Sequence, residues 1–403
     1  MQLQPQQLRD KRQEEFAEIW FKSRFGILYL CPRFGKIRTA LRAIALMGKA
    51  NPRVLIIHPI ETIKKSWIDD ITKWGYNLDC FSFVTTASLW KLVDSEKLYD
   101  VIIMDEVQLF SPANIQEMKS IIDRGNKCVM GLSGTISGQT AFDIRQSLNL
   151  PIIAEYSIEQ GIKEKVITDY KIHIVMTNLD NEEKYIVPSK KYPDFKVTEK
   201  ANYDYMTSRI EEIKSEVKAN NDLMVERAKA KGTLPSYEDF EKVDLGLLPI
   251  HRMHIFKKSI AKRRTTLGIM NRFKGERILI FCGVTAIADS LGVPVYHSKD
   301  KDEEVKDAFC RGEGDILATV DMFEAGVTIK PINRAIVNSF DSNPENLAQR
   351  ISRLTGFEYD SPDKVAMIYV VCTNTIERDW LDKALEFFDL TKVSYHYLKE
   401  EPV

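Results

Sequence analysis

The chain has 403 residues, and its 57 Lys and Arg nearly balance its 58 Asp and Glu, so no global positive field would attract a polyanion. This length exceeds what one hydrophobic core usually serves, and we expect two domains. The six cysteines lack the paired spacing of metal sites and disulfide frameworks, and no stretch approaches the roughly 18 apolar residues of a membrane span. We therefore expect a soluble, cytoplasmic monomer with reduced cysteines and no membrane contact.

Short runs rich in Ile and Val alternate with amphipathic stretches in two parts of the chain. The runs occupy residues 26–30, 54–58, 101–104 and 128–132, and then residues 278–282, 315–318, 335–337 and 366–371. Such alternation is typical of parallel strands that are buried on both faces and joined by helices. Between the two parts, residues 181–277 are charged and mostly helical in pattern.

The predicted fold class is therefore α/β, with two parallel-sheet units and a largely helical region between them. We place the first unit, which would bind a nucleotide, at residues 1–152. A connecting strand and helical insertion follow at residues 153–277 and the second unit at residues 278–392. Residues 393–403 are predicted to be a C-terminal tail.

A candidate phosphate-binding loop, Leu-Cys-Pro-Arg-Phe-Gly-Lys-Ile, spans residues 30–37 between an apolar run and an amphipathic stretch. Backbone N–H groups around Gly35 and the positive end of a helix can cradle phosphates, while Lys36 adds a charge. Arg33 stands where glycine is common, and Ile37 stands where Ser or Thr would donate a hydroxyl to Mg²⁺. The alternative is an ordinary strand-to-helix turn that happens to contain Gly-Lys.

Two carboxylates, Asp105 and Glu106, directly follow another apolar run. Ligands of open α/β sheets bind at the edge where the strands end. Asp105 is the candidate for holding Mg²⁺ through water, and Glu106 is the candidate for orienting and deprotonating an attacking water. The alternative is that both acids cap the next helix.

Lys36 and the run Asp-Glu-Val-Gln at 105–108 resemble motifs I and II of superfamily 2 helicases and translocases. Further matches follow in the family's order over residues 8–356: Gln13 resembles the element that reads adenine, residues 58–59 and 65–67 resemble motif Ia and the segment after it, and residues 132–135 resemble motif III. The resemblance implies two RecA-like domains that close around one ATP and its Mg²⁺. The ATP-binding residues that it implies are Gln13, Arg33, Phe34, Gly35, Lys36, Ile37 and Arg38.

The second half of the chain continues the resemblance. Residues 278–282 with 296–298 resemble motif IV, residues 319–328 resemble motif V, and residues 349–353 resemble motif VI. In the family, motif VI arginines reach the γ-phosphate from the opposite domain, which assigns catalytic roles to Arg353, Arg350 and Gln349. The residues implied to couple nucleotide state to domain movement are Gln108, Ser133, Thr135 and Gly326.

Two features leave alternatives to this arginine assignment. Gly356 stands where the family often carries a further arginine, so Arg353, with Arg350 second, would have to serve as the arginine finger. Arg350 and Arg353 are three residues apart, and they could also form an ordinary exposed helix face that pairs with acids.

In the family, nucleic acid lies across the tops of both domains, where hydroxyl groups contact phosphates and sugars. Candidates for these contacts are Thr85, Thr86, Ser298 and Thr319. A basic run between residues 251 and 277 also fits backbone binding, with a solvated helical face as the alternative. Its leading candidates are Lys257, Lys258, Arg263 and Arg264. Packing is the favoured use of Tyr203, Tyr205 and Tyr237, with base stacking as the other.

The resemblance implies an ATP-dependent DNA helicase or translocase, with single-stranded, duplex or branched DNA as its partner. The compact length suggests a phage-type enzyme that remodels branched or forked DNA in the host cytoplasm. Two other functions stay open. Ile37 and Gly356 favour a nucleotide-gated or catalytically weak DNA-binding clamp, and an RNA helicase is also compatible, because nothing in the sequence identifies a reader of the 2′-hydroxyl.

Overall fold

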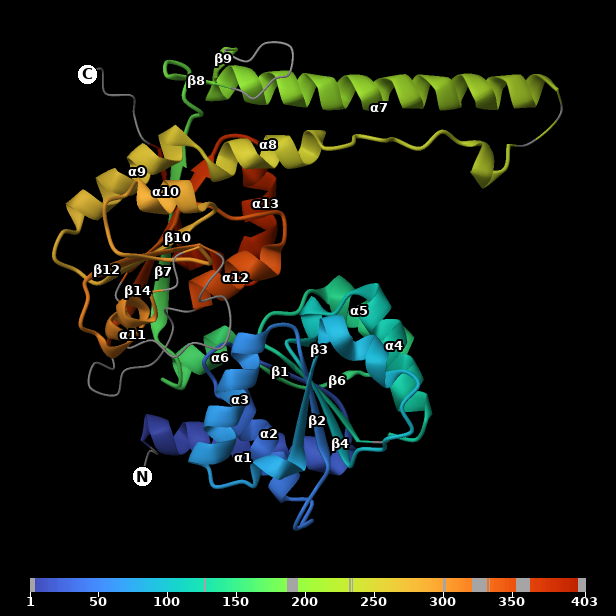
Figure 1. The fold of residues 1–403 in the computed structure, drawn as a ribbon, viewed down its shortest axis with the longest axis vertical. Coiled ribbons are helices and arrows are strands. Elements are labelled where there is room, and N and C mark those ends of the chain that lie inside the picture. The colour runs from blue at the N-terminus through green and yellow to red at the C-terminus, as the bar shows by residue number, and fades with distance from the viewer. Residues whose placement is uncertain are drawn as a thin grey trace.

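The structure is a computed structural model. It describes residues 4–126, 128–186, 195–231, 233, 235–299, 302–320, 332, 334–352 and 363–397. Two parallel β-sheets with helices packed on them form separate domains that face each other (Figure 1). None of the described helices combines the length and apolarity that crossing a bilayer requires.

The first domain is built on a six-stranded sheet with the strand order β3-β2-β4-β5-β1-β6. All of its pairings are parallel. Its strands are β1 (Phe25–Leu30), β2 (Val54–His58), β3 (Phe81–Thr85), β4 (Val101–Asp105), β5 (Val129–Ser133) and β6 (Ile152–Tyr156). Every residue of β2, β4 and β5 is buried, as expected for apolar strands covered on both faces.

Two apolar clusters cover the two faces of this sheet. On one face pack α1 (Pro5–Ser23), α2 (Lys36–Ala45) and α3 (Glu61–Lys73), through side chains that include Trp20, Leu41 and Trp67. On the other face pack α4 (Pro112–Asp123) and α5 (Gly138–Leu148), through Met118 and Ile144. The short helix α6 (Ile158–Lys163) then leads to the second domain.

The second domain is built on a seven-stranded sheet with the order β11-β12-β10-β13-β14-β7-β15, again with parallel pairings. Its strands are β7 (Asp169–Thr177), β10 (Ile278–Cys282), β11 (Val295–Tyr296), β12 (Ile316–Val320), β13 (Arg334–Val337), β14 (Val365–Thr373) and β15 (Val393–Tyr397). Its helices are α9 (Ile260–Arg272), α10 (Thr285–Asp289), α11 (Glu303–Arg311), α12 (Pro344–Ser352) and α13 (Ile376–Leu385). The predicted class, two parallel α/β units of the RecA-like kind, is confirmed.

The structure differs from the predicted domain limits in two places. Residues 393–397, predicted as a tail, form β15 and extend the second sheet beside β7. β7 itself comes from the predicted connecting region, yet it pairs along its whole length with β14. These pairings join segments about two hundred residues apart, and no local periodicity signals such a partner.

A long helix projects from the second domain. α7 (Glu199–Ala230) has 32 residues, and the segment between it and α8 (Leu248–Lys257) runs back toward the domain (Figure 1). The hairpin of β8 (Lys184–Ile186) and β9 (Lys196–Thr198) precedes α7. The predicted helical insertion is therefore present as an arm on the second domain.

Candidate active site

The phosphate loop connects β1 to α2 and is held in place by α1. Gly35 caps α2 with a φ of 99°, a conformation that favours glycine. Arg9 Nε and Gln13 Nε2 each donate to the carbonyl of Phe34, at 2.9 Å in both cases. A Cβ on Gly35 would lie 2.5 Å from Gln13 Nε2. The glycine is therefore required by its φ and by the close approach of α1.

The side chains of two residues of this loop pack against the core of the first domain. The Phe34 ring is fully buried and packs against Phe16 and Tyr156, with ring centroids 5.6 and 4.8 Å away. Its side chain therefore anchors the loop, and only its backbone is placed to meet a nucleotide. Ile37 packs partly buried against the core of the domain, so it offers a metal no oxygen.

The acidic pair lies at the carboxyl end of β4, opposite the loop. Asp105 is buried, and its Oδ2 accepts a hydrogen bond from the indole Nε1 of Trp67 at 2.7 Å, while its Oδ1 accepts the Glu106 N–H at 2.9 Å. Burial and the neighbouring Glu106 charge raise the pKa of Asp105 to about 6, against the opposing effects of Lys36 and Trp67. The predicted alternative, helix capping, does not describe this geometry, because Asp105 contacts Trp67 and Glu106 contacts Lys36.

A chain of polar contacts runs from the loop through the acidic residues to β5. Lys36 Nζ lies 2.8 Å from Glu106 Oε1, and Gln108 Nε2 donates to Glu106 Oε2 at 2.8 Å. Ser133 Oγ donates to Gln108 Oε1 at 2.7 Å, and the Thr135 N–H lies 3.3 Å from Ser133 Oγ. The residues predicted at motifs I, II and III therefore form one connected group.

The second domain lies against the phosphate loop and the acidic pair, and the two domains enclose a cavity there. A cavity of about 130 Å³ is lined from the first domain by Pro32, Arg33, Lys36, Glu106, Gly134 and Thr135, and from α12 by Gln349 and Ser352. The buried Gln349 Nε2 has no hydrogen-bond partner among the described residues. Gln349 is therefore the α12 side chain best suited to meet a phosphate in this cavity.

The arginines predicted beside Gln349 have different outcomes. Arg350 is buried, and its Nη1 donates to the Ser339 carbonyl at 2.7 Å, so its assignment as a second finger stays a prediction. Its packing in the core was not visible from its spacing in a helix. Arg353, Gly326 and Gly356 lie outside the described residues.

Another contact joins the two domains beside the cleft. Glu345, in the first turn of α12, is buried, and its Oε1 accepts the Ser137 N–H at 3.3 Å and lies 3.5 Å from Thr140 Oγ1. Ser137 caps α5, so the carboxylate meets the positive end of that helix. Burial raises the pKa of Glu345. The sequence analysis missed this residue, because its partners belong to the other domain.

A second cavity, of about 340 Å³, lies between α1, the phosphate loop with α2, and the end of α3. It is lined by Gln6, Arg9, Asp10, Gln13, Gly35, Arg38, Asp70, Lys73 and Trp74. The Arg38 guanidinium lies over the Trp74 ring, 3.2 Å from its centroid. Gln13 Oε1 is buried and has no hydrogen-bond partner among the described residues. Gln13 and Arg38 were predicted, whereas Trp74, from the far end of α3, was missed.

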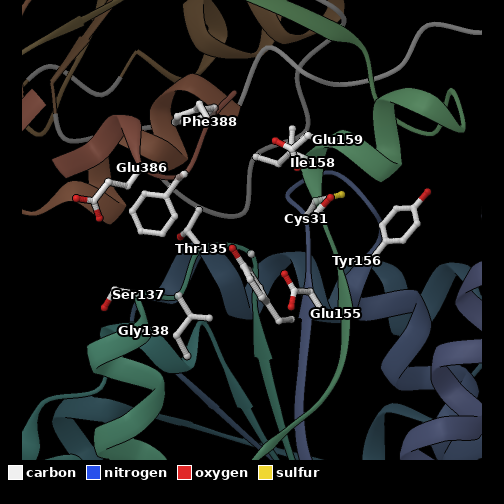
Figure 2. Close-up of a pocket in the computed structure, with 15 residues that line it drawn as sticks. Cys31, Thr135, Ser137, Gly138, Glu155, Tyr156, Ile158, Glu159, Glu386 and Phe388 are labelled. Atoms are coloured by element: carbon white, nitrogen blue, oxygen red, sulfur yellow. The ribbon is translucent and has the colours of Figure 1, made fainter. Parts of the chain in front are cut away.

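A third cavity, of about 330 Å³, opens between the domains next to the phosphate cavity (Figure 2). Thr135 and Gly134 line both cavities. Glu155 and Glu159 belong to the first-domain side and the connection that follows it, and Glu386 and Phe388 enter from the end of α13 (Figure 2). Two buried residues of motif III therefore border both cavities.

The residues predicted to contact nucleic acid do not all reach the surface. Thr85 ends β3 and Thr86 follows it, both half-buried, and Ser298 is exposed after β11. Thr319, by contrast, is buried and donates to the Tyr296 carbonyl at 3.0 Å. This hydroxyl links two neighbouring strands, and the contact of Thr319 with nucleic acid stays a prediction.

The basic run between residues 251 and 277 does not form one continuous patch. Lys262 is fully buried and pairs with Glu377 at 2.6 Å. Arg263 donates to Ser290 Oγ and to its carbonyl, and Arg264 is held by Asp180 and Glu183. Both guanidinium groups therefore have partners within the second domain, although Arg264 is exposed, and their contact with nucleic acid stays a prediction.

Lys257 and Lys258, at the end of α8, are accessible to solvent, and their contact with nucleic acid stays a prediction. Lys258 is exposed and Lys257 half-buried at the end of α8. A Cβ on Gly283, just past β10, would lie 3.0 Å from Lys257 Cγ, so Lys257 lies at the carboxyl end of that strand. Tyr203 packs against Phe256 as favoured, while Tyr205 is exposed.

The donor groups at the acidic pair fit a magnesium ion held mainly through water. Asp105 Oδ2 accepts one hydrogen bond and keeps a further lone pair for a metal-bound water. Ile37 supplies no hydroxyl, so the remaining ligands would be phosphate oxygens and water, an arrangement that Mg²⁺ commonly adopts.

Two sequence comparisons match known proteins. The family model described as "Helicase conserved C-terminal domain" matches residues 261–355. The DNA 3'-5' translocase XPB2 of Sulfurisphaera tokodaii is 24% identical over 388 residues, which cover 91% of this chain and 82% of that protein.

Solved structures share the fold at low sequence identity. The HsdR subunit of a type I restriction enzyme from Vibrio vulnificus YJ016 aligns with a TM-score of 0.58 at 14% identity, over 96% of this chain and 67% of that one. Dbp5 of S. cerevisiae, bound to RNA and ADP BeF3, aligns with a TM-score of 0.53 at 10% identity, over 93% of this chain and 85% of that one. Both likenesses concern the two-domain architecture.

Proposed function

We propose that this chain is a superfamily 2 helicase or translocase that hydrolyses ATP between its two domains to move along DNA. One observation carries the proposal. Lys36, Glu106, Gln108 and Ser133 form a connected polar chain at the carboxyl edge of the first sheet, and Gln349 of the second domain faces the same cavity. A group of this kind needs both domains to enclose a triphosphate, so nucleotide state and domain position are linked.

The base and the phosphates of ATP bind in separate cavities. The base enters the cavity between α1 and α3, where Gln13 Oε1 accepts a hydrogen bond from the exocyclic amine of adenine. The phosphates meet the backbone N–H groups of the loop and the positive end of α2. Lys36 then exchanges Glu106 for phosphate oxygens.

Release from Lys36 prepares Glu106 for proton transfer. The oxygen of a water molecule attacks the γ-phosphorus, the bond from that phosphorus to the ADP oxygen breaks, and Glu106 accepts the proton from the water. Gln108 stays hydrogen-bonded to both Glu106 and Ser133, so a movement of the Glu106 carboxylate also moves the contact with Ser133. Gln349, and Arg353 by the family resemblance, would stabilise the charge that develops on the phosphate from the other side.

Asp105 would hold Mg²⁺ through water. The ion would supply positive charge that neutralises the phosphates and so favours departure of the leaving group.

DNA is the proposed track, and 3′ to 5′ is the proposed direction, as in the printed activity of the archaeal relative. Thr85, Thr86 and Ser298 follow strands at the carboxyl edges of the two sheets, with Lys257 and Lys258 near the end of β10. Hydroxyls and amines there would grip phosphates without reading sequence. Branched or forked DNA is the proposed natural substrate.

The test is phosphate release by the purified protein with single-stranded, duplex and forked DNA, and with RNA, measured in parallel. We expect DNA to raise hydrolysis well above the level of Lys36→Ala, with the largest effect from forked DNA. If no DNA raises hydrolysis above the Lys36→Ala level, the protein is not a DNA-driven motor. Stronger stimulation by RNA would assign it to the RNA helicases.

Direction is tested separately, by displacement of streptavidin from single strands biotinylated at either end. A 3′ to 5′ motor clears the 5′ end faster, and preferential clearance of the 3′ end would contradict the proposed direction.

Ile37 gives specific support to a second function, a nucleotide-gated DNA clamp. With no hydroxyl at this position, one usual magnesium ligand is missing, and turnover would be slow. Ile37→Thr adds the hydroxyl. A clamp would bind DNA differently with and without ATP in the wild type, show negligible hydrolysis, and gain turnover in Ile37→Thr.

A further inference from the structure

Trp67 is a fully buried tryptophan whose polar atom bonds to a carboxylate. It lies on the inward stripe of α3 between Ile63 and Ile71, and all three side chains pack into the core of the first domain. A buried indole N–H needs a partner, because leaving it unpaired costs about 1–3 kcal/mol. Many acceptors would satisfy that need, yet here the acceptor is Oδ2 of Asp105, at 2.7 Å.

This bond completes the orientation of the Asp105 carboxylate. Oδ1 already accepts the N–H of the next residue, Glu106, at 2.9 Å. One bond to each oxygen fixes the plane of the group, which the backbone bond alone would leave free to swing. A carboxylate that holds a metal through water depends on this orientation, since the water must meet both the acid and the ion.

We propose that Trp67 is a positioning residue that sets Asp105 for the magnesium ion of the bound nucleotide. The inference rests on the proposed function, which makes Asp105 the metal-holding acid. Trp67 touches neither nucleotide nor metal, and it acts only through the carboxylate that it holds.

The same domain contains a matched control. Trp20 is also fully buried, and its indole donates to a backbone carbonyl, that of Val129, at 3.1 Å. Trp20→Phe and Trp67→Phe each remove one indole N–H from the same core and leave one acceptor unpaired. Only Trp67→Phe removes it from an acid at the active site.

The experiment compares binding of a fluorescent, non-hydrolysable ATP analogue in EDTA and across a magnesium titration. In Trp67→Phe we expect a rise of about 10- to 100-fold in the magnesium concentration that gives half of the full increase in analogue affinity. This is the usual cost of losing a partner of a metal-holding group. The analogue's affinity in EDTA should stay near the wild-type value. Trp20→Phe should keep the wild-type magnesium dependence, even where its thermal midpoint falls. A Trp67→Phe titration that overlays the wild type overturns the inference.

A second measurement uses the wild-type protein and needs no substitution in its core. The chain has five tryptophans, so ¹⁵N-indole labelling gives the wild type a small set of N–H resonances. We expect the Trp67 resonance to shift when magnesium is added to the protein with the analogue bound, and the Trp20 resonance to stay unchanged. If Trp67→Phe does not fold, its resonance is assigned by replacing the other four tryptophans singly. A Trp67 resonance that magnesium leaves in place overturns the inference.

The effect of magnesium on analogue binding to the wild type distinguishes failure of the nucleotide site from failure of the role of Trp67. If magnesium does not strengthen analogue binding to the wild type, the proposed nucleotide site fails and the inference fails with it. If magnesium strengthens binding equally in the wild type and in Trp67→Phe, the site stands and only the role of Trp67 is lost.

Discussion

Glu106 has a backbone conformation that few residues other than glycine adopt. Its φ is 48°, and such a conformation costs on the order of 1–3 kcal/mol in a residue with a Cβ. Lys36 and Gln108 hold the two oxygens of its carboxylate. The strained backbone turns the side chain from the end of β4 toward the phosphate loop, so the acid is in place before a nucleotide arrives.

Glu106→Gln should separate binding of ATP from its hydrolysis. The amide keeps the shape of the side chain but cannot accept a proton, so DNA-stimulated turnover should fall about 10²- to 10⁴-fold. Affinity for the fluorescent analogue should change little. Binding and phosphate release measured on the same preparation test this, and a variant with wild-type turnover would remove Glu106 as the base.

At the scale of elements, α1 is attached to the rest of the first domain at more than the phosphate loop. Arg12 donates through Nε to Glu164 at 3.0 Å, and the Tyr156 hydroxyl donates to the same carboxylate at 2.9 Å. These contacts join α1, β6 and the end of α6. The hydrogen bond from Arg12 holds the pKa of Glu164 below its ordinary value.

Glu164→Gln should destabilise the protein at neutral pH and lose its effect in acid. Because the folded-state pKa is lowered from 4.5, the charged pair stabilises the fold above that pH, and its contribution disappears as pH falls through the folded pKa. We expect about 1 kcal/mol at pH 7, a modest value since Arg12 is partly exposed. Urea unfolding between pH 3 and 7 measures it. Glu18→Gln, which removes the exposed pair with Lys22, should change little at any pH.

Strands with strong local hydrophobic patterns were predicted from the sequence. Strands that form only by pairing with a distant strand were missed. Residues 54–58 and 278–282 are strands at the predicted limits, since an apolar run bounded by polar residues carries its own signal. β15 has an ordinary, half-exposed pattern, and only its pairing with β7 makes it a strand. Lys36, which begins α2, and Glu106, which follows β4, were predicted as site residues from local signals of the same kind.

The missed site residues depend on distant contacts. Trp67 lies in the run 65–67 that resembles the segment after motif Ia, but its bond to Asp105 was not predicted. Trp74 looks like an ordinary apolar residue at a helix end, and only the fold brings it to Arg38. Glu345 looks like an acid in the first turn of a helix, although its partners are Ser137 and Thr140 of the other domain. No spacing within one segment encodes such pairs.

At the scale of the whole molecule, Glu345 stabilises the present arrangement of the two domains. It is a buried acid at the amino end of α5, and its removal takes away hydrogen bonds worth about 1 kcal/mol together, or about a fivefold change in a two-state equilibrium.

Glu345→Ala should therefore raise the KM for ATP about fivefold and lower energy transfer between dyes on the two domains. Glu386→Ala, which removes a carboxylate from the end of α13, is the control and should change neither quantity. An unchanged transfer efficiency in Glu345→Ala would show that other contacts set the domain arrangement.

The proposed DNA surface predicts a change in salt dependence. Replacing Lys257 and Lys258 with Ala should reduce the slope of log affinity against log salt by about 0.9 for each DNA phosphate that a lysine no longer neutralises. Lys214→Ala with Lys218→Ala, on the projecting α7, removes the same charge and should leave the slope unchanged. Equal slopes in both double variants would exclude the end of α8 from the DNA surface.

Helix α3 touches three places with distinct tasks. It begins just past β2, on the edge proposed to face DNA, carries Trp67 near its middle, and meets the base cavity at Trp74. A thirteen-residue helix is stiff, so its parts cannot move independently. Force from DNA on the first turn of this helix would therefore move the metal-binding carboxylate and the wall of the base cavity together. Loss of the base from its cavity would in turn weaken the contact with DNA.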